Sequence, residues 1–114
     1  MMKMRHSFTA VISRNETFVN DFETEPYESG WAGEARWFVR VLETGGKETE
    51  LVVQPQISPD GLFWCDAESE PKRIRGTGLY STGIQNFGNW LRLRGTLKGS
   101  DASFKLIIYL VLKE

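Results

Sequence analysis

The chain has 114 residues, a formal net charge of −1, 40% hydrophobic residues and one cysteine. A chain of this length folds around one hydrophobic core, and we expect a single domain over residues 1–114 with residues 1–5 flexible. The lone Cys65 excludes an internal disulfide, which is typical of a reducing compartment. The sequence shows no secretory leader pattern and no apolar run of helical membrane-spanning length, so we expect a soluble, cytoplasmic protein.

Charge is distributed unevenly along the chain. Residues 1–70 contain six basic and thirteen acidic side chains, whereas residues 71–98 contain six basic side chains and no acidic one. Three interpretations stay open: strands from the two parts neutralise one another, a basic face meets an anionic partner, or oppositely charged patches of two subunits meet.

The first third of the chain alternates apolar and polar residues. This period of two predicts strands over 7–13 and 17–22, with a turn at 14–16 between them. The stretch 23–33 fits neither the helical nor the strand period and contains one proline and two glycines, so we expect a loop that carries Tyr27 and Trp31.

A β-hairpin is expected next. Residues 34–44 and 47–57 both alternate, and Gly45-Gly46 between them is a dipeptide typical of tight hairpin turns. Pro55 lacks a backbone N–H, so it should place the end of the second strand at a sheet edge or in a bulge.

The segment after this hairpin is punctuated by turn residues. Ser58-Pro59-Asp60-Gly61 predicts a turn, and 62–66 a short strand. Residues 67–77 should form an exposed connection, and 78–88 either a bulged strand or a loop over the sheet.

The last part of the chain predicts a second hairpin, formed by residues 89–98 and 103–113. Its final strand is apolar on both faces, because Ile107, Tyr109 and Val111 alternate with a second set of large apolar residues. Such a strand lies inside a sheet that is covered on both sides. The whole pattern predicts an all-β, antiparallel β-sandwich of about seven or eight strands that resembles a jelly roll.

Few groups suited to catalysis or metal binding are present, so we expect no enzymatic activity, no cofactor and no metal. The single histidine, His6, lies near the terminus, and Cys65 is interpreted as a small hydrophobic residue in the core or on a covered face. A calcium site is the alternative for the acidic side chains that follow the predicted turn, but the spacing of an EF-hand loop is missing. These side chains are Asp60, Asp66, Glu68 and Glu70.

Aromatic and basic side chains supply the candidate ligand site. Trp90 shares a strand face with Arg92 and Arg94, a combination suited to stacking on a sugar ring. The full candidate set is Trp90, Arg92, Arg94, Arg36, Arg40 and Trp64. Carbohydrate binding is the alternative function, and binding of single-stranded nucleic acid through the acid-free segment 71–98 comes third.

The apolar second face of the last strand favours self-association, most often as a homodimer. The candidate interface residues are Ile107, Tyr109, Val111, Phe38 and Leu42. The competing explanation is that the loop 23–33 folds over this face.

Several residues of the C-terminal half form a recurrent pattern. They are Gln56, Ser58, Pro59, Asp60, Gly61 and Trp64, followed by Leu91, Arg92, Gly99 and the run 104–112. In this order they resemble small β-sandwich domains of phage virion accessory proteins and of some bacterial surface proteins. The resemblance implies binding or assembly, so we expect a non-enzymatic module that self-associates through a β-sheet face.

Overall fold

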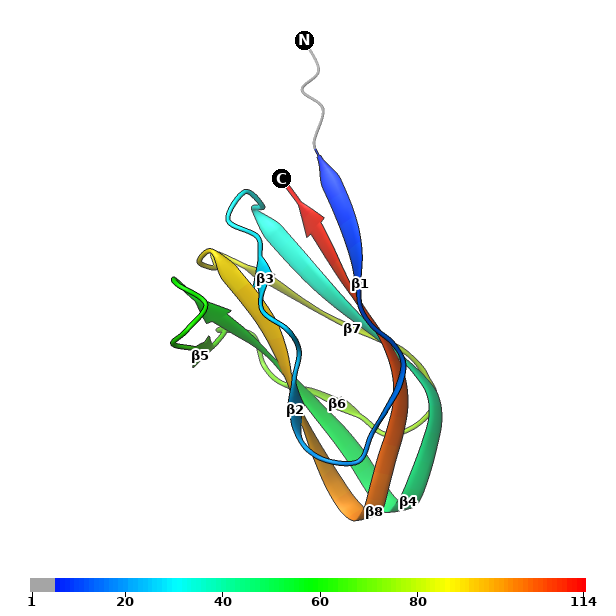
Figure 1. Cartoon of the computed structure of the whole chain (residues 1–114). Helices are drawn as coiled ribbons and strands as arrows, with labels where there is room; N and C mark the ends of the chain where they lie inside the picture. Colours follow the sequence, from blue (N-terminus) through cyan, green and yellow to red (C-terminus); the bar gives the residue numbers. More distant parts are fainter. Residues whose placement is uncertain (1–5) are drawn as a thin grey trace.

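The computed structural model describes residues 6–114, so the expected flexibility of residues 1–5 lies outside the described part of the chain. Within that part, eight strands form one antiparallel sheet that does not close on itself (Figure 1), which confirms the all-β, antiparallel prediction. No helix long and apolar enough to cross a membrane occurs among residues 6–114. The strands are β1 (Ser7–Phe18), β2 (Phe22–Glu23), β3 (Tyr27–Glu28), β4 (Glu34–Ser58), β5 (Cys65–Asp66), β6 (Lys72–Ile74), β7 (Gly78–Gln85) and β8 (Trp90–Lys113).

The two longest strands, β4 and β8, organise the fold. They pair with each other in antiparallel fashion along their whole length, from Glu34 opposite Lys113 to Ser58 opposite Trp90. Both strands bend at the lower end of the molecule in Figure 1, so that the paired ribbon folds back over itself. The two predicted hairpins are therefore wrong, because each predicted turn is a bend inside one long strand.

Glycines make this bend possible. Gly46 in β4 and Gly99 in β8 have φ angles of +98° and +111°, which side chains disfavour. A Cβ atom on Gly46 would lie 2.5 Å from the carbonyl oxygen of Ser100, and one on Gly99 would lie 2.7 Å from that of Glu48. A tight hairpin also needs glycine at positive φ, so the local sequence does not distinguish a hairpin from a bent ribbon.

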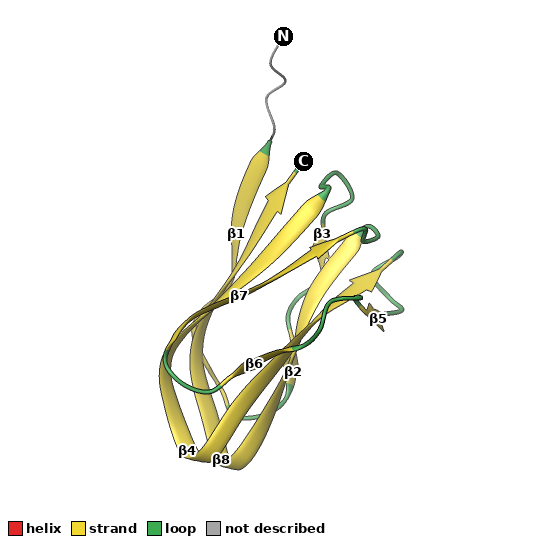
Figure 2. Ribbon diagram, turned by 180° about the vertical axis from the view of Figure 1, so that it is seen from behind, coloured by secondary structure: helices red, strands yellow, loops and turns green. Residues whose placement is uncertain are grey.

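The bend divides the sheet into two arms, which diverge from it in Figure 2. The first arm contains β1, residues 104–113 of β8, residues 34–44 of β4, and β7. The second arm contains β2, β3, residues 90–98 of β8, residues 48–58 of β4, β5 and β6.

The core lies between the arms and takes side chains from both. Its fully buried members include Trp37, Phe104 and Ile108 of the first arm and Leu51 and Leu93 of the second arm. These residues belong to one continuous cluster of buried apolar side chains. The alternation of burial along β4 and β8 leaves the intervening side chains on two outer faces.

The N-terminal region differs from its prediction. The expected turn at 14–16 lies inside β1, where Asn15 has a φ of +54° and the register with β8 shifts between Ser13 and Glu16. A bulge therefore replaces the turn. The expected strand over 17–22 is split between the end of β1 and the start of β2, and the rings of Phe18 and Phe22 stack with centroids 3.9 Å apart.

The middle of the chain contains three further differences. The strand predicted over 62–66 is limited to β5, which begins at Cys65. The segment 67–77, predicted as an exposed connection, contains β6 and the fully buried Ile74. The segment 78–88 contains β7, which pairs with β4 without a register shift, so the strand alternative is correct and its bulge is absent.

Pro55 lies inside β4 without interrupting the pairing with β8. It lies opposite Leu93, whose N–H donates to Thr24 Oγ1 and whose carbonyl accepts from the Thr24 N–H, both at 2.9 Å. The backbone polar groups of Leu93 thus point away from β4, and the missing N–H of Pro55 removes no hydrogen bond between the two strands. On the other side of β4, pairing with β6 ends at Val53 and pairing with β5 begins at Gln56.

Candidate functional site

The six predicted ligand residues lie on two outer surfaces rather than one. Trp90, Arg92 and Arg94 lie on the second arm, where Trp64 joins them. Arg36 and Arg40 lie on the first arm, in register with Val111 and Ile107 of β8. The two outer faces point away from each other because the core lies between the arms.

A polar ladder crosses the outer face of the second arm. Arg92 Nε donates to Gln56 Oε1 at 2.7 Å, and Gln56 Nε2 donates to Asp66 Oδ1 at 2.9 Å. The guanidinium carbon of Arg92 lies 4.4 Å from the centre of the Trp64 ring, a cation–π geometry. Trp64, Gln56 and Arg92 therefore form a preassembled group of one aromatic ring, one planar amide and one cation.

The turn at 58–61 holds the next part of this surface in place, as predicted. Ser58 Oγ accepts hydrogen bonds from the backbone N–H groups of Asp60 and Gly61 at 3.2 and 2.8 Å. Gly61, with a φ of +79°, lies against the ring of the half-buried Trp90. Trp90 is thus covered by this turn.

Two exposed apolar side chains at the tip of this loop were missed by the strand prediction over 62–66. Leu62 and Phe63 are 75% and 78% exposed. Their backbone N–H groups donate to Asp60 Oδ1 at 2.9 and 3.1 Å, which removes them from any strand ladder. These two hydrogen bonds lower the pKa of Asp60. The sequence Ser-Pro-Asp-Gly could have predicted this loop, because the side chain of an aspartate in this position accepts hydrogen bonds from the backbone N–H groups of the residues that follow.

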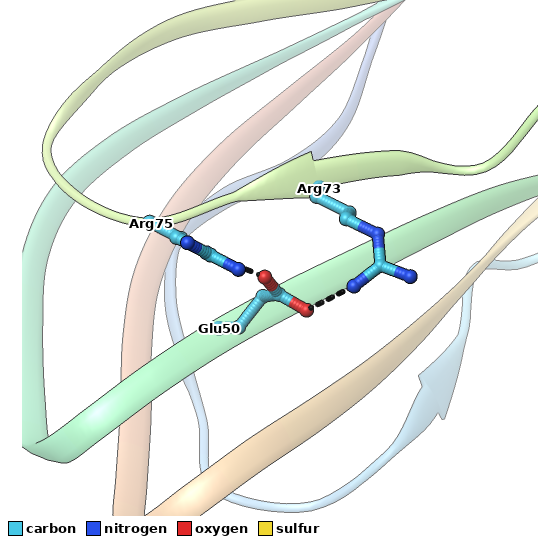
Figure 3. Close-up of polar contacts among 3 residues, drawn as sticks. All are labelled: Glu50, Arg73 and Arg75. Atoms are coloured by element: carbon cyan, nitrogen blue, oxygen red, sulfur yellow. Dashed lines mark hydrogen bonds and ion pairs between the residues drawn. The ribbon is translucent and has the colours of Figure 1, made fainter.

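Part of the basic segment pairs with an acidic residue of the first half of the chain. The carboxylate of Glu50 in β4 accepts from Arg75 Nε at 2.6 Å and from Arg73 Nη1 at 3.2 Å (Figure 3). The hydrogen bond from Arg75 lowers the pKa of Glu50, and the positive charges of Arg75 and Arg73 add to this effect. Glu23 of β2 also lies in register with Arg94. The segment without acidic residues thus lies beside acidic side chains from the first half of the chain.

The outer face of the first arm brings together the predicted interface residues. Phe38 lies directly opposite Tyr109, and Tyr109 lies opposite Val11 of β1. All five candidates are half-buried, and the exposed Val11 and Leu79 extend the group at its two sides. We call this group the outer apolar patch: Val11, Phe38, Leu42, Leu79, Ile107, Tyr109 and Val111. A cleft of about 530 Å³ opens on it between Arg40, Leu42, Leu79 and Tyr109.

The loop 23–33 does not cover this patch. It contains β3, whose Tyr27 lies opposite Leu91 on the second arm, and Tyr27 packs against the core with its ring 6.4 Å from that of Phe8. Trp31 at the end of the loop is 46% exposed. The alternative in which this loop acts as a lid over the last strand is therefore wrong.

The remaining chemical candidates are dispersed. Cys65 is exposed in β5, so its interpretation as a covered residue is wrong. Among residues 6–114, no group of three or more His, Cys, Asp or Glu side chains is placed to hold a metal ion. In particular, the Asp60 carboxylate is engaged by the backbone of its own loop.

Comparisons with known proteins give a likeness of fold. No family model and no curated protein matches the sequence. Among solved structures, the PBSX exported protein XepA matches with a TM-score of 0.60 and 10% sequence identity; the match covers 96% of this chain and 36% of that one. The structure of PirA matches with a TM-score of 0.50 and 13% identity, over 100% of this chain and 96% of that one. At these identities the likeness concerns the fold alone.

Proposed function

We propose that this protein is a non-enzymatic assembly module that associates with further copies of itself through the outer face of its first arm. The outer apolar patch carries this proposal. Its members come from four neighbouring strands and lie side by side on one surface. An apolar surface that spans several strands of a small domain is typical of a protein interface.

The surroundings of the patch favour a second copy as its occupant. Arg36 and Arg40 alternate with Phe38 along β4, whereas Glu34 stands at the end of the same strand. Two copies related by a two-fold axis bury the same patch on each side. The positively and negatively charged residues around one patch then lie close to those around the other. A homodimer is the smallest assembly of this kind.

We also infer the finer architecture that this function uses. Two arms that enclose one core, joined by a long bent ribbon, fit a β-sandwich wrapped in the manner of a jelly roll. In such an arrangement the inner faces form the core and the outer faces stay available for contacts between subunits.

Light scattering on a size-exclusion column tests the proposal with the substitution Val111→Glu. We expect the wild-type mass to exceed the monomer mass of 13.0 kDa and the mass of V111E to be lower. The matched control is Val52→Glu, because Val52 is half-buried on the opposite outer face. Each of the two valines lies in register with an arginine, Val111 with Arg36 and Val52 with Arg73. A wild-type mass of one chain at all concentrations, or equal masses for V111E and V52E, overturns the proposal.

A second candidate function is carbohydrate binding by the second arm. The observation that favours it is the preassembled group of Trp64, Gln56 and Arg92 beside Trp90. An aromatic ring next to a planar amide is suited to a pyranose with its ring of hydroxyls. A glycan array with wild-type protein and Trp64→Ala tests it: specific binding that W64A loses supports this function, and an array without signal excludes the glycans it displays. Nucleic-acid binding ranks below both, because acidic side chains neighbour the basic segment.

A further inference from the structure

We propose that the free edge of β7 pairs with β7 of a second copy, which extends the first arm into one continuous sheet across two subunits. This inference goes beyond the proposed function, since it names a second contact, at a strand edge rather than on the outer face of the first arm. Within residues 6–114, β7 pairs only with β4, so its other edge presents unpaired backbone groups. Such an edge is a template for another strand.

The other edges of the sheet carry protective features that β7 lacks. At one edge β1 has two register shifts and the charged residues Arg14 and Glu16 in its second half. On the second arm, β2, β3, β5 and β6 are two or three residues long, and β6 carries two cations. In contrast, β7 has eight residues, GLYSTGIQ, with no charge, no proline and no register shift. Natural proteins protect exposed edges with charge, bulges and short strands.

A cleft of about 650 Å³ opens at the β7 side of the first arm. It is lined by Gly83, Ile84 and Gln85 of β7, by residues of β4 and β8 that include Arg36, Phe38 and Val111, and by Glu68 and Ser69 of the segment between β5 and β6. The hydroxyl of Ser69 is buried and has no hydrogen-bond partner in the described chain. The cleft therefore borders both the outer face of the first arm and the second half of β7.

The sequence of β7 fits itself in antiparallel orientation. A two-fold axis at Thr82 sets Thr82 opposite Thr82 of the copy and Tyr80 opposite Ile84. Both pairs face inward, as the register of Thr82 with the buried Trp37 shows. The outward pairs are Ser81 with Gly83 and Leu79 with Gln85. No like charges meet, and threonine pairs and aromatic–aliphatic pairs across strands are stabilising. A neutral partner strand meets this edge without repulsion between like charges, and this chain supplies one.

Substitutions of opposite charge at Thr82 test whether β7 pairs with β7 of a second copy and whether the two Thr82 residues lie opposite each other. In the proposed dimer, Thr82→Lys sets two cations opposite each other and Thr82→Glu sets two anions opposite each other, so each variant alone should lose the β7 contact. An equimolar mixture should restore it, because lysine then faces glutamate. The readout is mass by light scattering, with native mass spectrometry to identify the mixed species. The controls are Thr96→Lys and Thr96→Glu, at a half-buried threonine on the outer face of the second arm, opposite Val52, and their masses should equal the wild-type mass.

Hydrogen exchange of the wild type provides a measurement that needs no substitution. Every second N–H of β7 faces the free edge, so alternate amides of this strand should become protected as the concentration rises from about 1 µM to about 1 mM. Equal exchange of the β7 amides at all concentrations overturns the inference, as does an unchanged mass for T82K and T82E.

These outcomes separate the edge contact from the face contact. If V111E lowers the mass and the Thr82 variants do not, the proposed function stands and the pairing of β7 is wrong. If only the Thr82 variants lower it, the edge contact stands and the outer apolar patch is not an interface. A monomer at every concentration overturns both.

Discussion

At the scale of single residues, Glu50 is a charged side chain whose burial differs from its sequence pattern. It alternates with inward-facing residues of β4, so it points outward, yet it is only 7% exposed because the side chains of Arg73 and Arg75 lie over it. The two arginines come from β6 and the residue after it, more than 20 positions further along the chain. Glu50 thus holds β6 against β4 from outside while Ile74 holds it from the core.

Replacing Glu50 with glutamine should make stability less dependent on acid. The pKa of Glu50 is lowered in the folded state, so its ionised form stabilises the fold above the unfolded pKa, about 4.3. This contribution is lost as the pH falls through the lowered, folded pKa. We expect the Tm of E50Q to be a few degrees below that of wild type at neutral pH. In strong acid the two values should converge.

Thermal unfolding followed by circular dichroism at several pH values measures this difference. Glu25→Gln in the exposed loop before β3 is the control, and its Tm should follow that of wild type. A Tm difference between E50Q and wild type that is independent of pH contradicts the assignment.

The contacts of single side chains were predictable from the sequence where both partners lie within a few residues of each other. The turn at 58–61 follows from Ser58 and Asp60, whose side chains bond to backbone groups within three residues. The same local chemistry explains the incorrect strand over 62–66, because Asp60 engages the amides of Leu62 and Phe63. The burial of Glu50 was not predictable, since it depends on arginines that only the sheet brings near.

At the scale of elements, the six predicted ligand residues lie on two separate surfaces. The alternation of apolar and polar residues predicts which face of a strand a side chain lies on, but it does not predict which arm of the sheet that part of the strand joins. Arg36 and Arg92 both alternate with buried residues, and both lie on outer faces as expected. The bend in the β4–β8 ribbon sets them on opposite sides of the molecule. The candidate interface residues stayed together because all five come from segments that pair directly, 34–44 with 104–113.

The docking of β2 on β8 depends on one glycine. Phe22 lies directly over Gly95, where its ring occupies the space that a side chain would fill. Gly95→Ala should therefore destabilise the protein by about 1–3 kcal/mol through overpacking. Unfolding in urea measures this change.

Gly76 provides the matched control for this substitution. A Cβ atom on Gly76 meets no atom within 4 Å, so Gly76→Ala should be neutral or stabilising by up to about 1 kcal/mol. Combining Gly95→Ala with Phe22→Leu should recover part of the loss, and equal stabilities for G95A and G76A contradict the packing of Phe22 on Gly95.

At the scale of the whole molecule, the two arms should unfold as one unit because they share one core. Ile108 of the first arm is fully buried, and Ile108→Ala should cost about 2–5 kcal/mol. Hydrogen exchange should then accelerate equally for core amides of both arms, including those of Val53 and Leu93 on the second arm.

The neighbouring Ile107 is the control for this experiment, because its side chain is half-buried on the outer face. Ile107 belongs to the outer apolar patch, so both variants are compared at the lowest protein concentration, where contacts between copies are weakest. Ile107→Ala should cost less than Ile108→Ala. Faster exchange confined to the first arm of I108A would show instead that the arms are separate cooperative units.

The long pairing of β4 with β8 also has a consequence during biosynthesis. The ribosome completes residues 34–58 well before residues 90–113 emerge, so β4 stays without its main partner while the intervening segment is made. During that interval the inward side of β4, including Trp37, Val39 and Leu51, remains in contact with water. Contacts this distant along the chain form slowly. The nascent chain is therefore most exposed to aggregation, and most in need of chaperones, in the period before β8 leaves the exit tunnel.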